Sequence, residues 1–253
     1  MISDFLSALN IVKKVLAADF ACEEKNFEEE GVIVYEAKEL PGRRRFPFRE
    51  KSLTIATMGR GVVINCNEGR LNWTKKNLGR LSRNEIFAIP AIACMQKYVS
   101  RDGQTIVGPD LKYFCTADIF TPLKAGKDIE ILIVDDAAQL ENYNDIRFPN
   151  SLCYSNNPQR VAAVAMCDGE IAGKAGASAD CDLMWQIGID TLPEYRQRGI
   201  GKALVSVLTE YILDHGLVPY YSTNVSNIAS QRIANSVGYR PAWTEMYSRE
   251  IQQ

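Results

Sequence analysis

The sequence predicts a mixed α/β protein, in which helices cover the faces of a mixed (α+β) sheet, and three observations support this. Short runs with apolar residues at every second position alternate with longer runs at helical spacing. Asp168-Gly169 stands between two apolar runs and is typical of a tight hairpin turn. The chain of 253 residues is also long enough to form one large or two ordinary domains. Strands and helices that alternate along the chain favour a sheet flanked by helices.

The first half of the chain contains both kinds of element. Apolar residues at helical spacing predict a first helix over 5–16, and the acidic segment 23–30 is expected in a solvated loop or helix end. The expected strands are 31–35, 52–57, 61–66 and 112–116, with 52–57 and 61–66 forming a hairpin, and the expected helices lie within 73–81 and 85–99. Pro90 is expected to limit the last of these helices.

The second half alternates strands and helices more regularly. The expected strands are 129–134, 161–167, 170–175, 183–189 and 219–223, and helices are expected to start near 135, 200 and 227. Segment 121–127, with one proline and one glycine, has the weakest pattern. We therefore place a domain boundary there, which gives an N-terminal mixed α/β domain (1–125) and a C-terminal domain (126–253).

The most informative segment is 195–204, which follows a predicted strand and opens a predicted helix. It holds three cations and the two glycines Gly199 and Gly201. Glycines let a backbone approach a ligand closely, and the first N–H groups of a helix attract anions. The segment lacks the spacing of a Walker A loop, and Leu204 stands where a dinucleotide fingerprint has its third glycine. The pattern R-x-x-G-x-G predicts a different phosphate-binding loop.

The ordered motifs around this loop resemble the GNAT superfamily of acyl-CoA-dependent N-acyltransferases. Residues 193–195 precede the loop, the motif from Asn227 to Ser230 opens the next helix, and Gly238-Tyr239 closes it. The resemblance covers about residues 129–253, and the N-terminal half resembles no family that we recognise. It implies a sheet that is splayed at its centre, with acetyl-CoA (CoA) lying in the splay.

The resemblance also implies which residues bind the cofactor. The backbone of the glycine loop is expected to bind the pyrophosphate, the end of the preceding strand to pair with pantetheine, and the Asn227 region to contact the pantetheine arm. The implied cofactor-binding residues are Ile189, Asp190, Thr191, Arg196, Gln197, Arg198, Gly199, Ile200, Gly201, Lys202, Asn227 and Ser230. Asn227 is also expected to cap its helix, since asparagine does this well by itself.

The general base and acid are less clear, because the chain departs from the family pattern. Ala234 stands where many relatives have a tyrosine that protonates the leaving thiolate, and Gln186 cannot accept a proton at neutral pH. The remaining catalytic candidates are Asp190, Glu245 and Tyr239. Asp182, Tyr220, Tyr221 or a water chain are further possibilities that the sequence leaves open.

Composition excludes several classes of protein. The net charge of −2 gives no indication of a nucleic-acid partner, and no apolar run is long enough to span a membrane. Seven cysteines without paired spacing indicate reduced thiols and a cytoplasmic protein, and one histidine makes a metal site improbable. The oligomeric state is not indicated. The cationic run 43–45 is most simply a solvated loop.

These observations predict an N-acetyltransferase that acylates a primary amine of a small molecule or peptide by direct attack in a ternary complex. The N-terminal domain is expected to line the acceptor cleft. One alternative is a non-catalytic acyl-CoA-binding or regulatory protein. Another is an enzyme with a longer acyl donor, for which Met184 and Trp185 are the residues to inspect.

Overall fold

The computed structural model describes residues 4–46, 52–143, 145–151 and 159–251, and the structural statements below concern these residues. They divide into two compact units that do not follow chain order. The C-terminal unit comprises Met1–Leu9, Tyr113–Thr223 and Asn227–Pro241, and the N-terminal unit comprises Asn10–Lys112, Asn224–Ser226 and Ala242–Gln253. The boundary expected at residue 125 and the expected cleft-lining role of 1–125 stay predictions.

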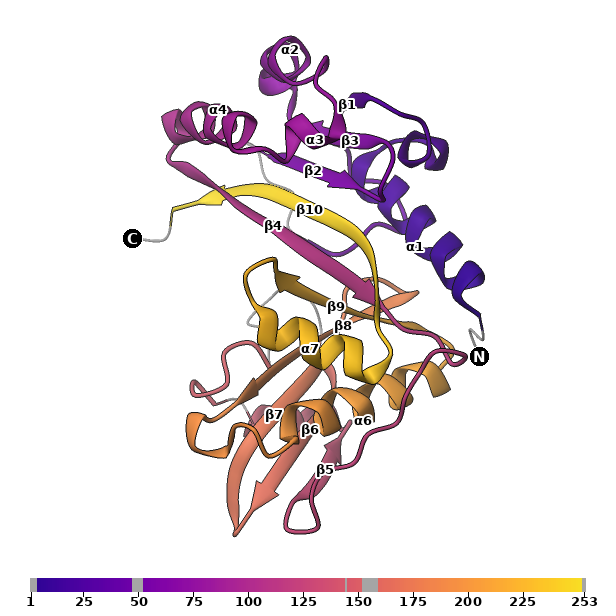
Figure 1. The fold of residues 1–253 in the computed structure, drawn as a ribbon, viewed down its shortest axis with the longest axis vertical. Helices are drawn as coiled ribbons and strands as arrows, with labels where there is room; N and C mark the ends of the chain where they lie inside the picture. Colours follow the sequence, from indigo (N-terminus) through magenta and orange to yellow (C-terminus); the bar gives the residue numbers. More distant parts are fainter. Residues whose placement is uncertain (1–3, 47–51, 144, 152–158, 252–253) are drawn as a thin grey trace. The chain divides into compact units, whose positions relative to one another are not determined.

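The sheet of the N-terminal unit has the strand order β1-β3-β2-β10-β4 (Figure 1). Strands β2 and β3 pair in an antiparallel hairpin as predicted, while β1 runs parallel to β3 and β10 antiparallel to β2. The strand bounds are β1 (Val32–Glu36), β2 (Leu53–Thr57), β3 (Val62–Cys66), β4 (Gln104–Phe114) and β10 (Arg240–Glu250). Residues 112–114 of the predicted strand 112–116 are thus the end of a longer strand, and residues 115 and 116 lie beyond it.

The helices of the first half are α1 (Phe5–Phe20), α2 (Glu68–Asn77), α3 (Arg83–Ile86) and α4 (Ile89–Val99), with 3-10 turns at Glu24–Phe27 and Ser100–Asp102. The helix expected within 85–99 is divided, because Ser82 and Glu85 form a capping box on α3 and Pro90 stands in the first turn of α4. The buried side of α1 runs from Ala8 to Phe20, whereas Leu6 is 66% exposed.

The sheet of the C-terminal unit has the order β9-β8-β7-β6-β5. Its strands are β5 (Glu130–Val134), β6 (Gln159–Cys167), β7 (Glu170–Ala179), β8 (Met184–Thr191) and β9 (Val218–Asn224). The neighbours from β5 to β8 are antiparallel, and β8 and β9 are parallel. Asp168 and Gly169 both have positive φ angles (51° and 83°) in the predicted hairpin turn between β6 and β7.

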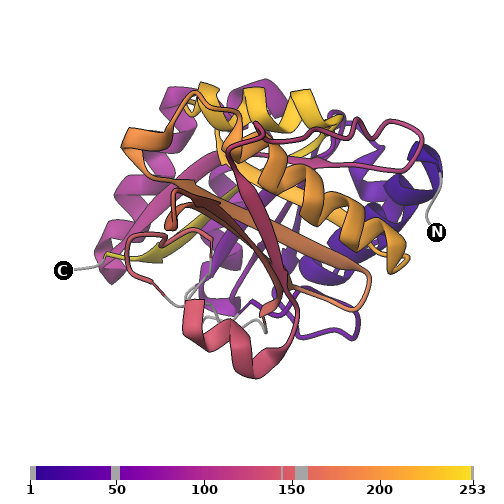
Figure 2. The same cartoon turned by 90° about the horizontal axis from the view of Figure 1, so that it is seen from below.

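Three helices accompany this sheet: α5 (Ala137–Leu140), α6 (Ile200–Asp214) and α7 (Ile228–Val237), with 3-10 turns at Glu141–Tyr143 and Pro193–Tyr195. Helix α6 packs against β6, β7 and β8 and against α7, and its crossing of the strands is visible from below in Figure 2. Its buried residues follow the predicted helical spacing from Ile200 to Leu213.

The two faces of β7 have different neighbours. A Cβ atom on Gly173 would lie 2.9 Å from Cγ2 of Ile200, so this residue faces α6. A Cβ atom on Gly176 would lie 1.8 Å from the carbonyl oxygen of Ser151, and residues three apart on a strand point to opposite faces. Helix α6 therefore covers one face of the sheet, and the segment around Ser151 covers the other.

The structure confirms the predicted fold class, a mixed sheet with helices on its faces. Among the helices of the described residues, none has the length and apolar character that a membrane crossing requires.

Candidate functional site

Strands β8 and β9 separate at the centre of the C-terminal unit. Their pairing runs from Met184↔Val218 to Ile187↔Tyr221 and ends there among the described residues. Strand β8 continues to Thr191 and remains paired with β7 on its other side. The segment Gly188–Thr191 therefore has an edge without a β9 partner, and this edge can pair with an extended ligand.

The predicted glycine loop follows directly. Gln197 and Gly199 both have positive φ angles (65° and 80°), and Gly199 is the N-cap of α6 without a side-chain hydrogen bond to the helix. The first intrahelical bond at this end runs from Ala203 N to Gly199 O (3.1 Å). The N–H groups before Ala203 consequently lie at the positive end of the helix dipole, where an anion is favoured.

Gly201 has a different reason to be glycine. A Cβ atom there would lie 3.0 Å from Cδ1 of Ile233 on α7 and 3.3 Å from Cδ1 of Ile189 on β8. The absence of a side chain lets α6 approach both elements, and this brings the start of α6 next to the free edge of β8. The buried Ile200 anchors the same turn in the core.

Two of the three cations of the loop contact residues outside it. Arg198 forms an ion pair with Asp128, and its guanidinium lies 5.7 Å from the centre of the Tyr195 ring. The Nε atom of Arg196 donates to the carbonyl oxygen of Thr191 (3.4 Å). Lys202 is exposed in the first turn of α6. All three side chains are attached beside the uncapped helix end.

Asn227 and Ser230 lie together at the start of α7. The side-chain oxygen of Asn227 accepts from Ser230 N (3.1 Å), which makes Asn227 a helix cap as expected. The Ser230 hydroxyl is 2.8 Å from the hydroxyl of Tyr221. Ala234, at the position of the family tyrosine, is fully buried.

Asp190, one of the three catalytic candidates, holds a loop on the face opposite α6. Its carboxylate accepts from Asn150 N (2.6 Å), Asn150 Nδ2 (2.7 Å) and Ser151 N (3.1 Å). Lys174 is its partner in the β7–β8 register and is fully buried. Burial lowers the pKa of Lys174 to about 8, although Asp145 and Asp190 oppose this shift.

Tyr239, the second candidate, is 2% exposed, and its hydroxyl lies 2.8 Å from that of Thr209 on α6. Burial raises the pKa of Tyr239 well above its usual value. Its contacts are those of a packed core residue that links the end of α7 to α6. The structure brings Tyr239 and Asp190 into the same unit as the glycine loop.

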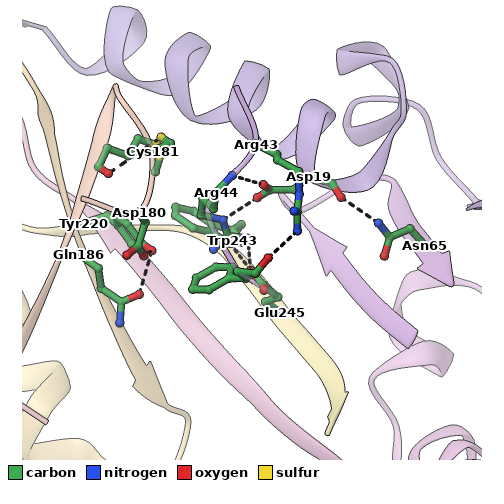
Figure 3. A network of polar contacts seen from close by, with 12 residues as sticks. Asp19, Arg43, Arg44, Asn65, Asp180, Cys181, Gln186, Tyr220, Trp243 and Glu245 are labelled. Atoms are coloured by element: carbon green, nitrogen blue, oxygen red, sulfur yellow. Dashed lines mark hydrogen bonds and ion pairs between the residues drawn. The ribbon is translucent and has the colours of Figure 1, made fainter. Parts of the chain in front are cut away.

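Glu245, the third candidate, belongs to the N-terminal unit and lies in a buried ion cluster (Figure 3). It accepts from Arg44 Nη2 (2.9 Å) and Trp243 Nε1 (3.0 Å), while Asp19 accepts from Arg44 Nε (2.5 Å). Burial alone would raise the pKa of Glu245, but the cations Arg44 and Lys112 and the N–H donation from Trp243 lower it to about 2. Such a carboxylate is a weak base.

The same cluster corrects the prediction for residues 43–45. A solvated loop was expected, but Arg44 is only 2% exposed. Arg43 also has partners, since its Nη2 atom donates to the carbonyl oxygen of Phe46 (3.0 Å) and it forms an ion pair with Glu39.

Sequence reasoning missed one buried acidic group of the C-terminal unit. Asp180, 1% exposed, accepts from the Ser178 hydroxyl (2.8 Å) and from the hydroxyl of Tyr220, which also lies 2.8 Å from the side-chain oxygen of Gln186 (Figure 3). The alternation of β7 and β8 could have placed Ser178 opposite Gln186, but it does not indicate the contact with Asp180. No group of histidine, cysteine or acidic side chains within the described ranges has the arrangement of a metal site.

Comparison with known proteins agrees with this architecture. Residues 130–239 match the model of the Acetyltransferase (GNAT) family. A search of curated proteins found no match.

Several solved structures are similar to part of the chain. A GCN5-related N-acetyltransferase-like protein from Streptococcus suis is 17% identical with a TM-score of 0.48, over 62% of this chain and 67% of that one. A GCN5-related N-acetyltransferase from Kribbella flavida is 17% identical with a TM-score of 0.46, over 62% and 64%. The structure of AAC(6')-Iy with a CoA-containing bisubstrate analogue is 21% identical with a TM-score of 0.37, over 45% and 92%. Residues 130–239, less than half of the chain, are thus similar to acetyltransferases of the GNAT family.

Proposed function

We propose that this chain is a cytoplasmic N-acetyltransferase that transfers an acetyl group from acetyl-CoA to a primary amine of a small molecule or peptide. The observation that carries the proposal is the uncapped start of α6 beside the free edge of β8, within the segment that matches the family. An anion site next to an unpaired strand edge suits a ligand that has a pyrophosphate at one end and an amide chain at the other.

The chain's own groups fit this cofactor. The backbone from Gln197 to Lys202 would hold the pyrophosphate, with Arg196 and Arg198 adding positive charge. The edge Ile189–Thr191 would pair with the pantetheine amides, and an N–H group near Thr191 would donate to the thioester oxygen. Removal of one such donor from an acyl-transfer site costs on the order of 3 kcal/mol. Asn227 and Ser230 would contact the pantetheine arm from the start of α7.

Direct attack by the amine in a ternary complex is the simplest reaction for this site. When bound, acetyl-CoA supplies the activated acetyl group. The chain must orient the amine towards it and accept a proton, because an amine of the lysine type is protonated at neutral pH, with a pKa of about 10.4.

Asp190, Glu245 and Tyr239 remain the proposed catalytic candidates, and their surroundings favour different roles. Asp190 stands at the end of the free edge of β8 and positions the loop at Asn150 and Ser151. Glu245 and Tyr239 are both buried, in an ion cluster and against α6 respectively. We therefore favour Asp190 as the candidate that acts near the acceptor.

A non-catalytic acyl-CoA-binding protein is the second candidate function. It is favoured by Ala234, which removes the usual proton donor, and by the absence of an acidic side chain at Gln186. Only the first candidate function includes acyl transfer, whereas both require binding of the cofactor.

A thermal-shift titration with acetyl-CoA, CoA and a longer acyl-CoA tests the shared claim. At a concentration of 100 Kd, a ligand that binds only the folded state should raise the melting temperature by about 5–10 °C. ATP serves as the nucleotide control and should give a much smaller shift. The absence of a shift with all three CoA ligands would exclude both functions, whereas binding without CoA release in the presence of amines would favour the second.

A further inference from the structure

The N-terminal unit holds a cavity of about 310 Å³ between the start of α2 and the end of α4, two helices that Figure 1 labels. This volume lies at the lower end of the range for small-molecule sites. The residues that line it are Asn67, Gly69, Arg70, Tyr98, Arg101 and Asp102. Gly69, Arg101 and Asp102 are exposed, so the cavity opens to solvent.

Arg70 brings a buried positive charge to this cavity, because the residue is only 3% exposed. Its Nη2 atom donates to Asp102 Oδ2 (2.8 Å) and to Gln104 Oε1 (3.0 Å). Its Nε and Nη1 atoms also carry N–H groups, and neither has a hydrogen-bond partner among the described residues. Buried donors in folded proteins are nearly always paired. The guanidinium therefore lacks acceptors that a ligand in the cavity could supply.

Two further features of the lining favour a negatively charged ligand group. Arg101 adds a second cation. Asn67 is the N-cap of α2, and its side chain accepts no hydrogen bond from the helix. The first N–H groups of α2 consequently remain available at the positive end of the helix dipole. Together with Arg70, they suit a carboxylate or a phosphate.

The remaining polar groups of the lining call for a hydrogen-bond donor. Asn67 Oδ1 is buried and has no hydrogen-bond partner in the described part of the chain, and Asp102 adds a negative charge. Asp102 would repel a phosphate dianion, which would also leave Asn67 Oδ1 without a donor. An α-amino acid has a carboxylate for the two arginines and an ammonium group, on the neighbouring carbon, for Asn67 and Asp102.

We propose that this cavity binds a free α-amino acid. Its carboxylate would pair with Arg70 and Arg101, and its ammonium group with Asn67 Oδ1 and Asp102. Tyr98, whose ring stacks on that of Trp73 with the centroids 3.7 Å apart, would offer an aromatic wall to the ligand. The inference uses residues of the N-terminal unit alone and does not rest on the proposed acetyl-CoA site.

A thermal-shift screen of the standard amino acids, each at about 10 mM, identifies the ligand because specific binding raises the melting temperature. Isothermal titration calorimetry then gives its Kd. Acetate and methylamine are the control ligands, since each carries only one of the two charged groups. Both should bind at least about 10-fold more weakly, because a hydrogen bond to a charged group contributes that much to affinity. Inorganic phosphate tests for a simple anion site and should also bind more weakly.

Variants of the lining residues locate the ligand. Asn67→Leu keeps the size of the side chain, removes the unpaired acceptor and costs α2 no side-chain cap bond, so the Kd should rise about 10-fold. Arg70→Met should raise the Kd by about 10–100-fold. Arg101→Gln changes an exposed residue and should raise the Kd by about 3–10-fold, so it carries the test if the Arg70 variant does not fold. The matched control is Arg80→Gln, an exposed arginine of the same unit outside the lining, which should leave the Kd unchanged.

Three results would overturn this inference. The first is the absence of binding by any amino acid in both measurements. The second is a Kd that Asn67→Leu and Arg101→Gln leave unchanged, since the amino acid then binds elsewhere. The third is phosphate or acetate binding as tightly as the amino acid, which would make the cavity a simple anion site. None of these measurements involves acetyl-CoA, so failure of this inference and failure of the proposed function are distinguishable.

Discussion

Gly199→Asp is expected to abolish measurable acetyl-CoA binding and to leave the protein folded. A Cβ atom at this position would have no neighbouring atom within 4 Å, so it meets no obstacle there. A non-glycine residue at the observed φ of 80° costs about 1–2 kcal/mol, and an aspartate at an N-cap recovers part of this by accepting helix N–H groups. The same carboxylate occupies those N–H groups and repels the pyrophosphate. Isothermal titration calorimetry should show at least about a 100-fold weaker Kd.

Gly216→Asp is the matched control, because Gly216 also has a positive φ (73°) and open space around its Cα, at the opposite end of α6. It should lower the melting temperature by a similar or larger amount, since an acidic residue is unfavourable at a helix C-terminus. Its Kd for acetyl-CoA should equal that of the wild type. Wild-type binding by Gly199→Asp would show that the loop is not the pyrophosphate site.

Glu245→Ala is expected to cause the largest loss of stability. It would leave Arg44 buried with Asp19 as its remaining acidic partner among the contacts described, and it would remove the acceptor of Trp243 Nε1. Breaking a buried ion pair in this way typically costs about 3–5 kcal/mol. Urea unfolding followed by tryptophan fluorescence should show this loss, because Trp243 lies in the cluster. Glu250→Ala, at an exposed position of the same strand, should change the free energy of unfolding by less than about 0.5 kcal/mol.

Glu245 should also make the stability of the folded protein depend on pH. The pKa of Glu245 falls from an ordinary 4.5 to about 2 in the folded protein, so its contribution to stability is complete above pH 4.5 and is lost as the pH falls towards 2. The pKa of Asp19 is raised by burial, in spite of Arg44, so Asp19 opposes this trend. Glu245→Gln should therefore lose less stability than the wild type between pH 4.5 and pH 2. An equal loss in both proteins would contradict the role of Glu245 in the cluster.

The C-terminal elements could be predicted because their signals are local. The alternation over 183–189, the loop at Gly199 and the cap at Asn227 each depend on residues close in sequence, and each lies in the expected element. The family resemblance implied the splay. The pairing of β8 with β9 ends at Ile187, which agrees with it. The assignment of individual residues to cofactor contacts stays a prediction.

The polar networks could not be predicted because they join distant segments. Arg44 is buried by contacts with Asp19 and Glu245, which are 25 and 201 residues away in sequence, and the local run of arginines gives no sign of this. Asp180 is 40 residues from Tyr220, and their contact depends on a strand register that the local pattern does not determine. Buried charge is therefore where the sequence analysis and the structure differ most.

Amide hydrogen exchange with and without acetyl-CoA tests the central claim most directly, since it locates the cofactor on the chain. The proposed site predicts slower exchange in peptides that cover Gly188–Thr191 and Gln197–Ala203. The β2–β3 hairpin of the N-terminal unit should exchange at an unchanged rate. Protection confined to other segments, with the loop and the edge of β8 unchanged, would contradict the assignment of acetyl-CoA to this site.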